Sequence, residues 1–119
     1  MAKILLIDDE EQVLKSVGML LEAQGHEVIP IRDSEKAEEA IRNLDCDLIV
    51  TDIRMSPVDG MQLLMLAEKV KPDVPAIVIS AYTSEHTVKH CMDIGCKAYI
   101  KKPFQVQEVL DAVNSCLVR

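Results

Sequence analysis

Residues 48–60, LIVTDIRMSPVDG, decide how the fold is arranged. The leucine-rich, β-branched run at 48–51 is short enough for a buried strand, and it stops abruptly at the carboxylate of Asp52. Open α/β sheets bind ligands beyond the carboxyl ends of their strands, so Asp52 is a candidate functional residue. The alternative is that Asp52 only forms the turn that follows, as aspartate often does.

The whole chain has the length and composition of one globular domain over residues 1–119. Its residues are 49% hydrophobic and only 3% aromatic, so the core must be aliphatic. The formal charge of −7 argues against direct nucleic-acid binding and favours a cation as partner. No apolar run approaches the ~20 residues of a membrane span, and the N-terminal run is too short for a signal peptide. We therefore expect no membrane contact and a cytoplasmic location.

Five short apolar runs alternate with segments of helical periodicity, which predicts an α/β fold with five strands and five helices. The predicted strands are residues 3–7, 27–31, 48–51, 76–80 and 98–100. Their crossover connections make the sheet parallel and doubly wound. Pro30 cannot donate a hydrogen bond to a neighbouring strand and belongs at a sheet edge. This favours the flavodoxin-like strand order 2-1-3-4-5, in which the first and third strands are neighbours.

Residue type and spacing also predict two features of the helices. Ser34 is the expected N-cap of the second helix. The residues expected on the inward face of the fourth helix are Val88, Cys91, Met92 and Gly95.

The cysteines are expected to be reduced and mostly buried, because the chain is no small secreted scaffold and has no C-x-x-C pair. They are Cys46, Cys91, Cys96 and Cys116. A zinc site is an alternative, because His-x-x-x-His places two imidazoles one helical turn apart. Its ligands would be His86, His90, Cys91 and Cys96. This spacing matches no familiar zinc module, so histidines that face solvent are favoured.

Acidic residues follow the first predicted strand as well as the third. Asp8 and Asp9 come directly after residues 3–7, so the predicted strand order brings them into one crevice with Asp52. Three close carboxylates repel one another unless a cation lies among them. Oxygen ligands without histidine or cysteine fit Mg²⁺ better than zinc. The alternative is that these acids are merely exposed at loop ends and cap the first helix.

Ser80 and Lys102 come from two further strand ends on the same side of the predicted sheet. With a cation in the acidic cluster, Asp52 could attack phosphorus and hold a phosphoryl group. Lys102 would neutralise the phosphoryl charge, and Ser80 would donate a hydrogen bond to it. Taken singly, Ser80 would be read as a turn cap and Lys102 as a solvated lysine.

Taken together, these residues resemble the receiver domain of two-component response regulators, similar to the chemotaxis regulator, over essentially the whole chain. The residues that carry the resemblance are Asp8-Asp9, Asp52 within TDIRM, Asp59-Gly60, Ser80-Ala81, Tyr99 and Lys102-Pro103-Phe104. Each of these motifs is weak alone, but the set is highly specific.

The resemblance implies a phosphorelay function that depends on Mg²⁺ or Mn²⁺. Asp52 would accept a phosphoryl group from a histidine kinase or phosphotransfer protein. Asp9 would bind the metal directly, Asp8 mostly through water, and Asp52 and the backbone carbonyl of Arg54 would complete the protein ligands. Such a domain catalyses only its own phosphorylation and dephosphorylation, so we expect no turnover enzyme.

The resemblance also implies a switch. Ser80 would be the switch hydroxyl, Tyr99 the aromatic side chain that changes rotamer, and Lys102 the charge partner, with a cis peptide before Pro103. The fourth helix, fifth strand and fifth helix would form the face that changes, meets an effector or a fused output domain, and could support a homodimer. Whether the chain is a single-domain regulator or part of a longer protein stays open.

One departure from the family pattern lies beside Asp52. The family usually has Pro then Gly after the methionine, whereas Ser56 and Pro57 follow Met55 here, with the loop length to Gly60 unchanged. Because Pro57 restricts Ser56 to extended conformations, we expect the backbone beside the site and the phosphoryl lifetime to differ from those of relatives.

Two other functions are weighed against this interpretation. A flavodoxin-like cofactor binder would need backbone amides that cradle a phosphate at the first loop, where the acids at residues 8–11 would repel it. A Mg²⁺-dependent phosphohydrolase could also use an aspartyl phosphate, but no acid is obviously placed as general base for fast hydrolysis.

Overall fold

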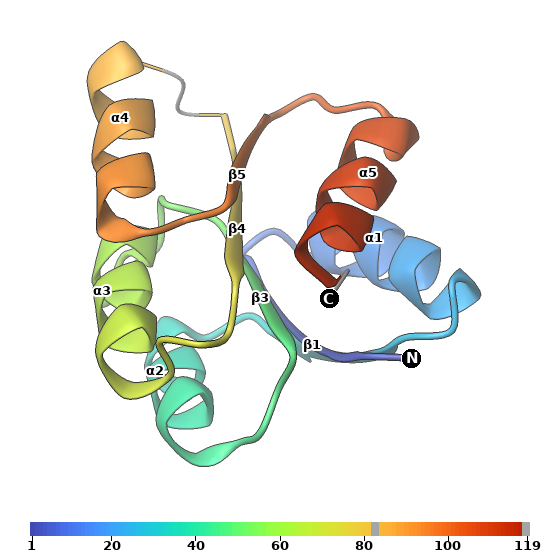
Figure 1. Cartoon of the computed structure of the whole chain (residues 1–119), viewed down its shortest axis with the longest axis horizontal. Helices are drawn as coiled ribbons and strands as arrows, with labels where there is room; N and C mark the ends of the chain where they lie inside the picture. Colours follow the sequence, from blue (N-terminus) through green and yellow to red (C-terminus); the bar gives the residue numbers. More distant parts are fainter. Residues whose placement is uncertain (82–83, 118–119) are drawn as a thin grey trace.

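Five parallel strands form one sheet in the order β2-β1-β3-β4-β5, with helices on both sides (Figure 1). The computed structural model describes residues 1–81 and 84–117. Its elements are β1 (Lys3–Ile7), α1 (Glu11–Ala23), β2 (Glu27–Ile31), α2 (Ser34–Asn43), β3 (Leu48–Thr51), α3 (Gly60–Val70), β4 (Ala76–Ser80), α4 (Glu85–Ile94), β5 (Ala98–Lys101) and α5 (Val106–Leu117). The predicted flavodoxin-like fold, its strand order and its five helices are confirmed.

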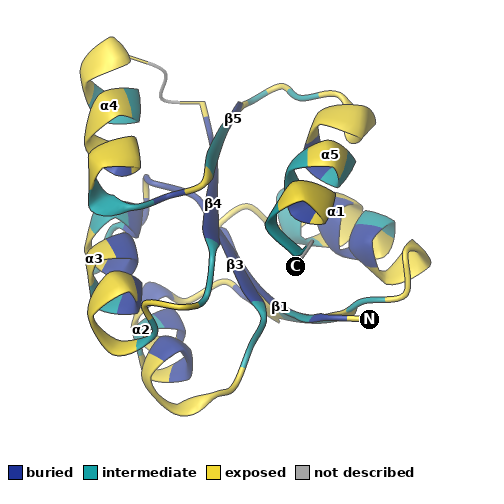
Figure 2. Cartoon of the chain, in the orientation of Figure 1, coloured by how far each residue is buried: buried dark blue, intermediate teal, exposed yellow. Residues whose placement is uncertain are grey.

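Alternate side chains of each central strand enter two separate apolar layers, as the pleat of a strand requires. On one side of the sheet, Leu5 and Ile49 pack with α2, α3 and α4. On the other side, Leu6 and Val50 pack with α1 and α5. Figure 2 shows the central strands β3 and β4 in dark blue between these two helical layers. Because both faces of β3 and β4 are covered, all their residues are buried and only their carboxyl ends can reach a ligand.

Strand β2 is an edge strand, as Pro30 predicts. Pro30 lies opposite Leu6 of β1, and β2 has no second neighbour. Strand β5 forms the other edge and runs one residue further than predicted, to Lys101. The edge positions leave β1 and β3 adjacent at the centre of the sheet.

Two local predictions for the helices are wrong. Asp33, not Ser34, caps α2, because its carboxylate accepts from the N–H groups of Glu35 and Lys36. Ser34 is buried, and its hydroxyl accepts from the Val58 N–H at 3.1 Å. In α4, Met92 is 46% exposed instead of facing inward.

No helix in the described part of the chain is long and apolar enough to cross a membrane.

Candidate functional site

The pairing of β1 with β3 places two carboxylates side by side. Ile7 lies opposite Thr51, so the next residues, Asp8 and Asp52, leave the sheet together. The Asp52 N–H donates to the Ile7 carbonyl at 3.0 Å, which holds the two strand ends in register. Asp8 is 1% exposed and Asp52 is 5% exposed. Two buried carboxylates at neighbouring strand ends need positive partners to be tolerated.

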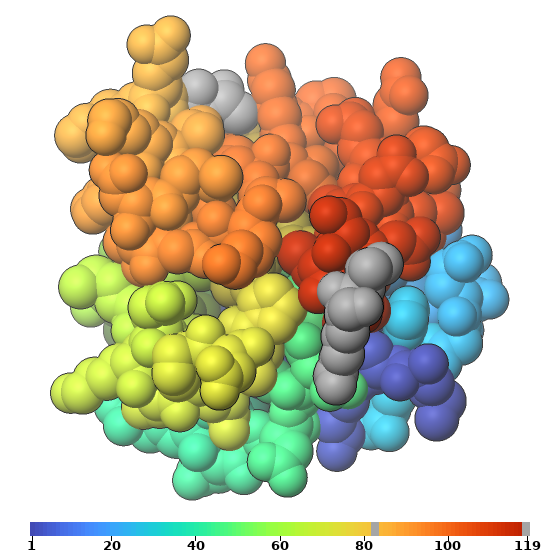
Figure 3. Space-filling model, viewed as in Figure 1, coloured from blue at the N-terminus to red at the C-terminus, as the bar shows by residue number. Residues whose placement is uncertain are grey.

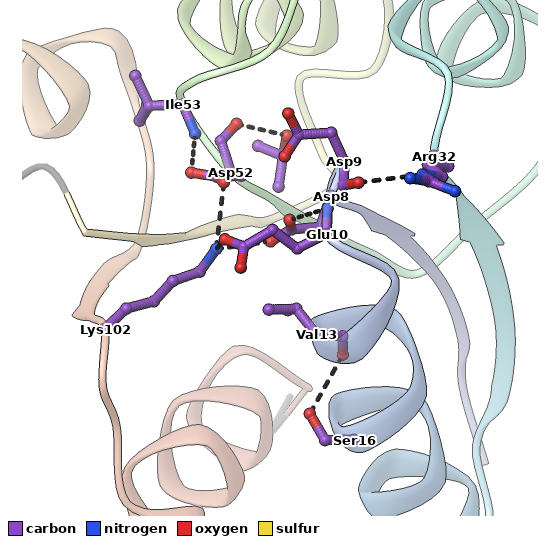
Figure 4. Close-up of polar contacts among 10 residues, drawn as sticks. Asp8, Asp9, Glu10, Val13, Ser16, Arg32, Asp52, Ile53 and Lys102 are labelled. Atoms are coloured by element: carbon purple, nitrogen blue, oxygen red, sulfur yellow. Dashed lines mark hydrogen bonds and ion pairs between the residues drawn. The ribbon is translucent and has the colours of Figure 1, made fainter.

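Lys102 supplies the positive partner from the far edge of the sheet. Its backbone N–H donates to the Ser80 carbonyl at 2.9 Å, which carries the β4–β5 pairing past the strand ends. Its ammonium then lies 3.0 Å from Asp8 Oδ2, 3.1 Å from Asp52 Oδ2 and 3.0 Å from Glu10 Oε1 (Figure 4). One lysine therefore pairs with three carboxylates that follow two strands, and its single positive charge offsets only part of their negative charge.

The second oxygen of each buried carboxylate is held by the backbone. Asp8 Oδ1 accepts from the Glu10 N–H at 2.9 Å, and Asp52 Oδ1 accepts from the Ile53 N–H at 2.7 Å. This leaves Oδ2 of both residues directed toward the Lys102 ammonium. The two oxygens of Asp52 thus have different partners, with Oδ1 bound to the backbone and Oδ2 bound to a side chain.

Burial and charge perturb two groups of the cluster. Burial raises the pKa of Asp8, although hydrogen bonds from the Glu10 N–H and from Lys102 act in the opposite direction. Burial alone would lower the pKa of Lys102, but hydrogen bonds to Asp8 and Glu10 and the charge of Asp52 outweigh it, so its pKa is raised. Lys102 therefore carries its positive charge throughout the physiological pH range.

Gly60 allows the loop after Asp52 to fold back onto the site. Its N–H donates to the Ile53 carbonyl at 2.8 Å. A Cβ atom at this position would overlap the Asp52 carbonyl oxygen and lie 2.6 Å from the Ile53 Cα. Asp59, just before it, caps α3 in a reciprocal capping box with Gln62. The motif Asp59-Gly60 thus fixes the backbone that carries Asp52.

The acidic cluster has the donor set for a hard divalent cation. One carboxylate oxygen from each of Asp8, Asp9, Glu10 and Asp52 lies within 4.8 Å of the others. An adjoining hollow, lined by Asp9, Arg54 and Met55 among others, opens the cluster to solvent. Oxygen ligands of this kind suit Mg²⁺ or Mn²⁺, which keep several waters and need few protein carboxylates. The residues present therefore fit such an ion.

Ser80 and Tyr99 lie together on neighbouring strands. Ser80 ends β4 and is buried, while Tyr99 is half-buried beside the layer that contains α4. Burial raises the pKa of Tyr99, and a side-chain hydrogen bond with Ser80 opposes this increase. A side-chain hydrogen bond therefore joins the Ser80 hydroxyl to the Tyr99 hydroxyl across the two strands.

Glu10 is the residue of this site that the sequence interpretation missed. Its side chain is 60% exposed, yet it pairs with Lys102. The acidic run at residues 8–11 was a signal, but it did not distinguish Glu10 from Glu11.

The alternative zinc site does not form. His86 and His90 are exposed on α4, whereas Cys91 is fully buried and Cys96 is 3% exposed. In residues 1–81 and 84–117, the acidic cluster is the one group of three or more such residues close enough to share a metal ion. All four cysteines are free, but only Cys91 and Cys96 are buried, so the prediction of mostly buried thiols holds for two of the four.

Two proline peptides near the site are cis. The Lys102–Pro103 bond is cis, in agreement with the prediction. The Ser56–Pro57 bond is cis as well, which the sequence interpretation did not foresee.

Comparisons with known proteins agree with this geometry. Residues 4–114 match the family model of the response regulator receiver domain. The chain is 30% identical over 119 residues to the response regulator SaeR of Staphylococcus aureus. This match covers 100% of the present chain and 52% of SaeR. It thus spans about half the length of this curated relative.

Solved structures give the same result. The CheY-like receiver domain protein of Methanospirillum hungatei JF-1 superimposes with a TM-score of 0.93 and 28% identity, over 98% of this chain and 94% of that one. NtrX from Brucella abortus matches with a TM-score of 0.90 and 29% identity, over 98% of this chain but 27% of NtrX.

The fold and the site define a doubly wound α/β protein with an acidic crevice at the point where the strand order reverses. Within this class, the chain belongs to the receiver domain family of two-component response regulators, and phosphorelay signalling is its general function.

Proposed function

We propose that this domain accepts a phosphoryl group on Asp52 from a histidine kinase or phosphotransfer protein. The observation that carries this proposal is the position of Asp52 Oδ2. It lies at a buried strand end, 3.1 Å from the Lys102 ammonium and within the acidic cluster. A nucleophilic carboxylate oxygen beside a fixed positive charge is the arrangement that phosphoryl transfer to aspartate needs.

In the proposed transfer, Asp52 replaces the imidazole nitrogen of the donor as the group bonded to phosphorus. Asp52 Oδ2 attacks the phosphorus of a phosphohistidine, and a new O–P bond forms while the P–N bond breaks. The electron pair of that bond stays on the imidazole nitrogen of the donor, which then takes up a proton from water. Lys102 moves from the carboxylates to the phosphoryl oxygens, and Ser80 donates a hydrogen bond to one of them.

We propose that Mg²⁺ or Mn²⁺ is held by Asp8, Asp9, Asp52 and the backbone carbonyl of Arg54. When bound, such an ion offsets the negative charge of the carboxylates and of the incoming phosphoryl group. Glu10 is a further candidate, because its carboxylate belongs to the same cluster.

The same site would release the phosphoryl group to water. Attack of water on phosphorus breaks the O–P bond and regenerates the Asp52 carboxylate. We propose that the domain catalyses only these reactions of its own side chain and is no turnover enzyme.

We propose that phosphorylation changes the face formed by α4, β5 and α5. The contact between Ser80 and Tyr99 supports this, because a phosphoryl group that attracts the Ser80 hydroxyl removes a partner from Tyr99. A downstream effector, a fused output domain or a second copy of the chain would meet this face. The cytoplasmic location expected from the sequence stays a prediction.

A phosphorylation assay tests the proposal directly. Acetyl phosphate and Mg²⁺ should add one phosphoryl mass to the wild-type chain, measured by mass spectrometry of the intact protein. Asp52→Asn should abolish the addition, and Asp73→Asn, at an exposed position, should leave it unchanged. Addition that persists in Asp52→Asn would refute the phosphoacceptor, and multiple turnover of a generic phosphate ester would indicate a phosphohydrolase instead.

A further inference from the structure

Two histidines lie side by side on the outer face of α4, away from the acidic cluster. His86 and His90 are one helical turn apart, and both are exposed. Their ring centroids are 6.3 Å apart, with an angle of 44° between the ring planes. Side chains four residues apart share one face of a helix, so the two imidazoles project from the same stripe of α4.

These imidazoles border a shallow hollow that belongs to α4 alone. The hollow is lined by His86, Lys89, His90 and Asp93. Lys89 and Asp93 form an ion pair of 3.1 Å. Figure 3 shows the orange atoms of α4 at the upper left of the molecular surface. The hollow is therefore accessible from solvent.

The ring nitrogens of both residues are available for a ligand. Among the described residues, neither imidazole has a hydrogen bond or ion pair, and their only recorded contact is with each other. The third histidine differs, because His26 Nδ1 accepts from the Ala2 N–H at 3.1 Å. His26 therefore provides a control inside the same chain.

We propose that His86 and His90 form a two-imidazole site for a divalent transition-metal ion. Neutral imidazole nitrogen suits Zn²⁺, Cu²⁺ and Ni²⁺, whereas the acidic cluster offers only oxygen. Two nitrogens that bind one ion at roughly 2.0–2.1 Å must approach each other to about 3 Å. Rotation of the two exposed side chains brings them to this separation, and water fills the remaining coordination positions. The proposal is independent of phosphorylation at Asp52.

The site differs from the four-ligand zinc site considered from the sequence. Cys91 and Cys96 lie in the apolar layer beneath α4 and take no part in it. Because the helix itself sets the spacing of the two imidazoles, the helical form of α4 brings both ligands together before the ion arrives.

Titration calorimetry with Ni²⁺ tests the proposal on the full chain. Saturating Mg²⁺ is present throughout so that it competes with Ni²⁺ for the acidic cluster. The wild type should bind one Ni²⁺ per chain at this site. His86→Ala and His90→Ala should each weaken binding by roughly a hundredfold, because loss of either ligand removes the chelate effect. His26→Ala should bind as the wild type does.

A thermal melt supplies an independent measurement. Ni²⁺ that binds the folded chain raises its melting temperature by mass action, so in the same saturating Mg²⁺ the wild type should shift more than His86→Ala and His90→Ala. Both substitutions lie on the surface, and circular dichroism checks that α4 is retained. The proposal is overturned if Ni²⁺ binds either single variant as tightly as the wild type, or if the melting temperature of the wild type does not respond.

Discussion

The carboxyl edge of the sheet and the layer between α3 and α4 are both buried, but they bury opposite kinds of groups. At the sheet edge, Asp8 and Asp52 are charged side chains held by Lys102 and by backbone N–H groups. In the α3–α4 layer, Cys91 Sγ lies 3.7 Å from the Met61 sulfur, with hydrocarbon around it.

The difference shows two ways of keeping a buried group stable. The charged edge depends on the position of particular atoms, because each carboxylate oxygen has one specific partner. The α3–α4 layer, which we call the sulfur layer because Cys91 and Met61 meet there, depends for its stability on the exclusion of water. Burial raises the pKa of Cys91, and it raises the pKa of Cys96 to about 11, so both thiols stay neutral at physiological pH. Substitutions that move atoms should harm the edge most, and substitutions that add polarity should harm the layer most.

Gly60→Ala should have the largest effect, because it displaces the backbone at the charged edge. The new Cβ atom would meet the carbonyl of Asp52, which has no side-chain freedom to move away. We expect a loss of about 3 kcal/mol or more in the free energy of unfolding. Urea denaturation measures this value, and the phosphorylation assay should show a parallel loss of labelling.

Gly18→Ala is the matched control. Its Cβ atom would lie 3.9 Å from Leu6 and Val28, which is ordinary contact. Inside α1, alanine should therefore stabilise the chain by about 0.5–1 kcal/mol. Equal losses in the two variants would mean that the charged edge needs no special backbone position.

Cys91→Ser should have an intermediate effect, because it places a hydroxyl in the sulfur layer. Cys91 is fully buried, and its recorded side-chain hydrogen bond is a weak one to Met61. We expect a loss of about 1–3 kcal/mol in the free energy of unfolding. Cys116→Ser, at a half-buried position of α5, should cost clearly less. If the two variants lost the same stability, exclusion of water would not be what holds this layer together.

Asp8→Asn should have the smallest effect, and it should stabilise the chain at neutral pH. Burial raises the pKa of Asp8 in the folded state, so the folded chain holds this proton to higher pH than the unfolded chain does. The stability that Asp8 contributes is therefore present below its ordinary value of 3.8 and is lost as the pH rises through the raised pKa. Asparagine does not titrate, so the free energy of unfolding of Asp8→Asn does not fall with pH for this reason.

The measurement is the free energy of unfolding of both chains from pH 4 to pH 7 in a metal chelator. The difference in favour of Asp8→Asn should grow with pH across this window, and Asp73→Asn at an exposed position controls for the lost charge. A wild type that is the more stable chain at pH 7 would mean that the pairing with Lys102 outweighs burial.

The two regions also differ in how far the sequence predicts them. Strand ends such as Ser80 and Asp52 follow from apolar runs that stop at a polar residue, and Pro30 places its strand at an edge. The gathering of Asp8, Asp52 and Lys102 then follows from the strand order alone. These contacts join residues far apart in the sequence, but each lies at a fixed position in a regular sheet.

The predictions that were wrong or incomplete concern side chains whose surroundings are set by another part of the fold. Serine is a common N-cap residue, but Asp33 caps α2, and the Ser34 hydroxyl instead accepts a hydrogen bond from the Val58 N–H in the loop before α3. Glu10 reaches Lys102 across 92 residues, and no helical or strand period encodes that contact. Met92 has the spacing of an inward residue but is exposed. The spacing of apolar residues predicts which face of a helix or strand is apolar, but it does not predict which other element covers that face.

The two edges of the sheet bear on how this domain behaves at high concentration. An exposed strand edge can recruit a strand of another molecule and start aggregation. Pro30 removes one backbone donor from β2, and β5 has only four residues and ends at a charged lysine. Both edges therefore resist strand addition, so we expect the domain not to polymerise through its sheet at high concentration.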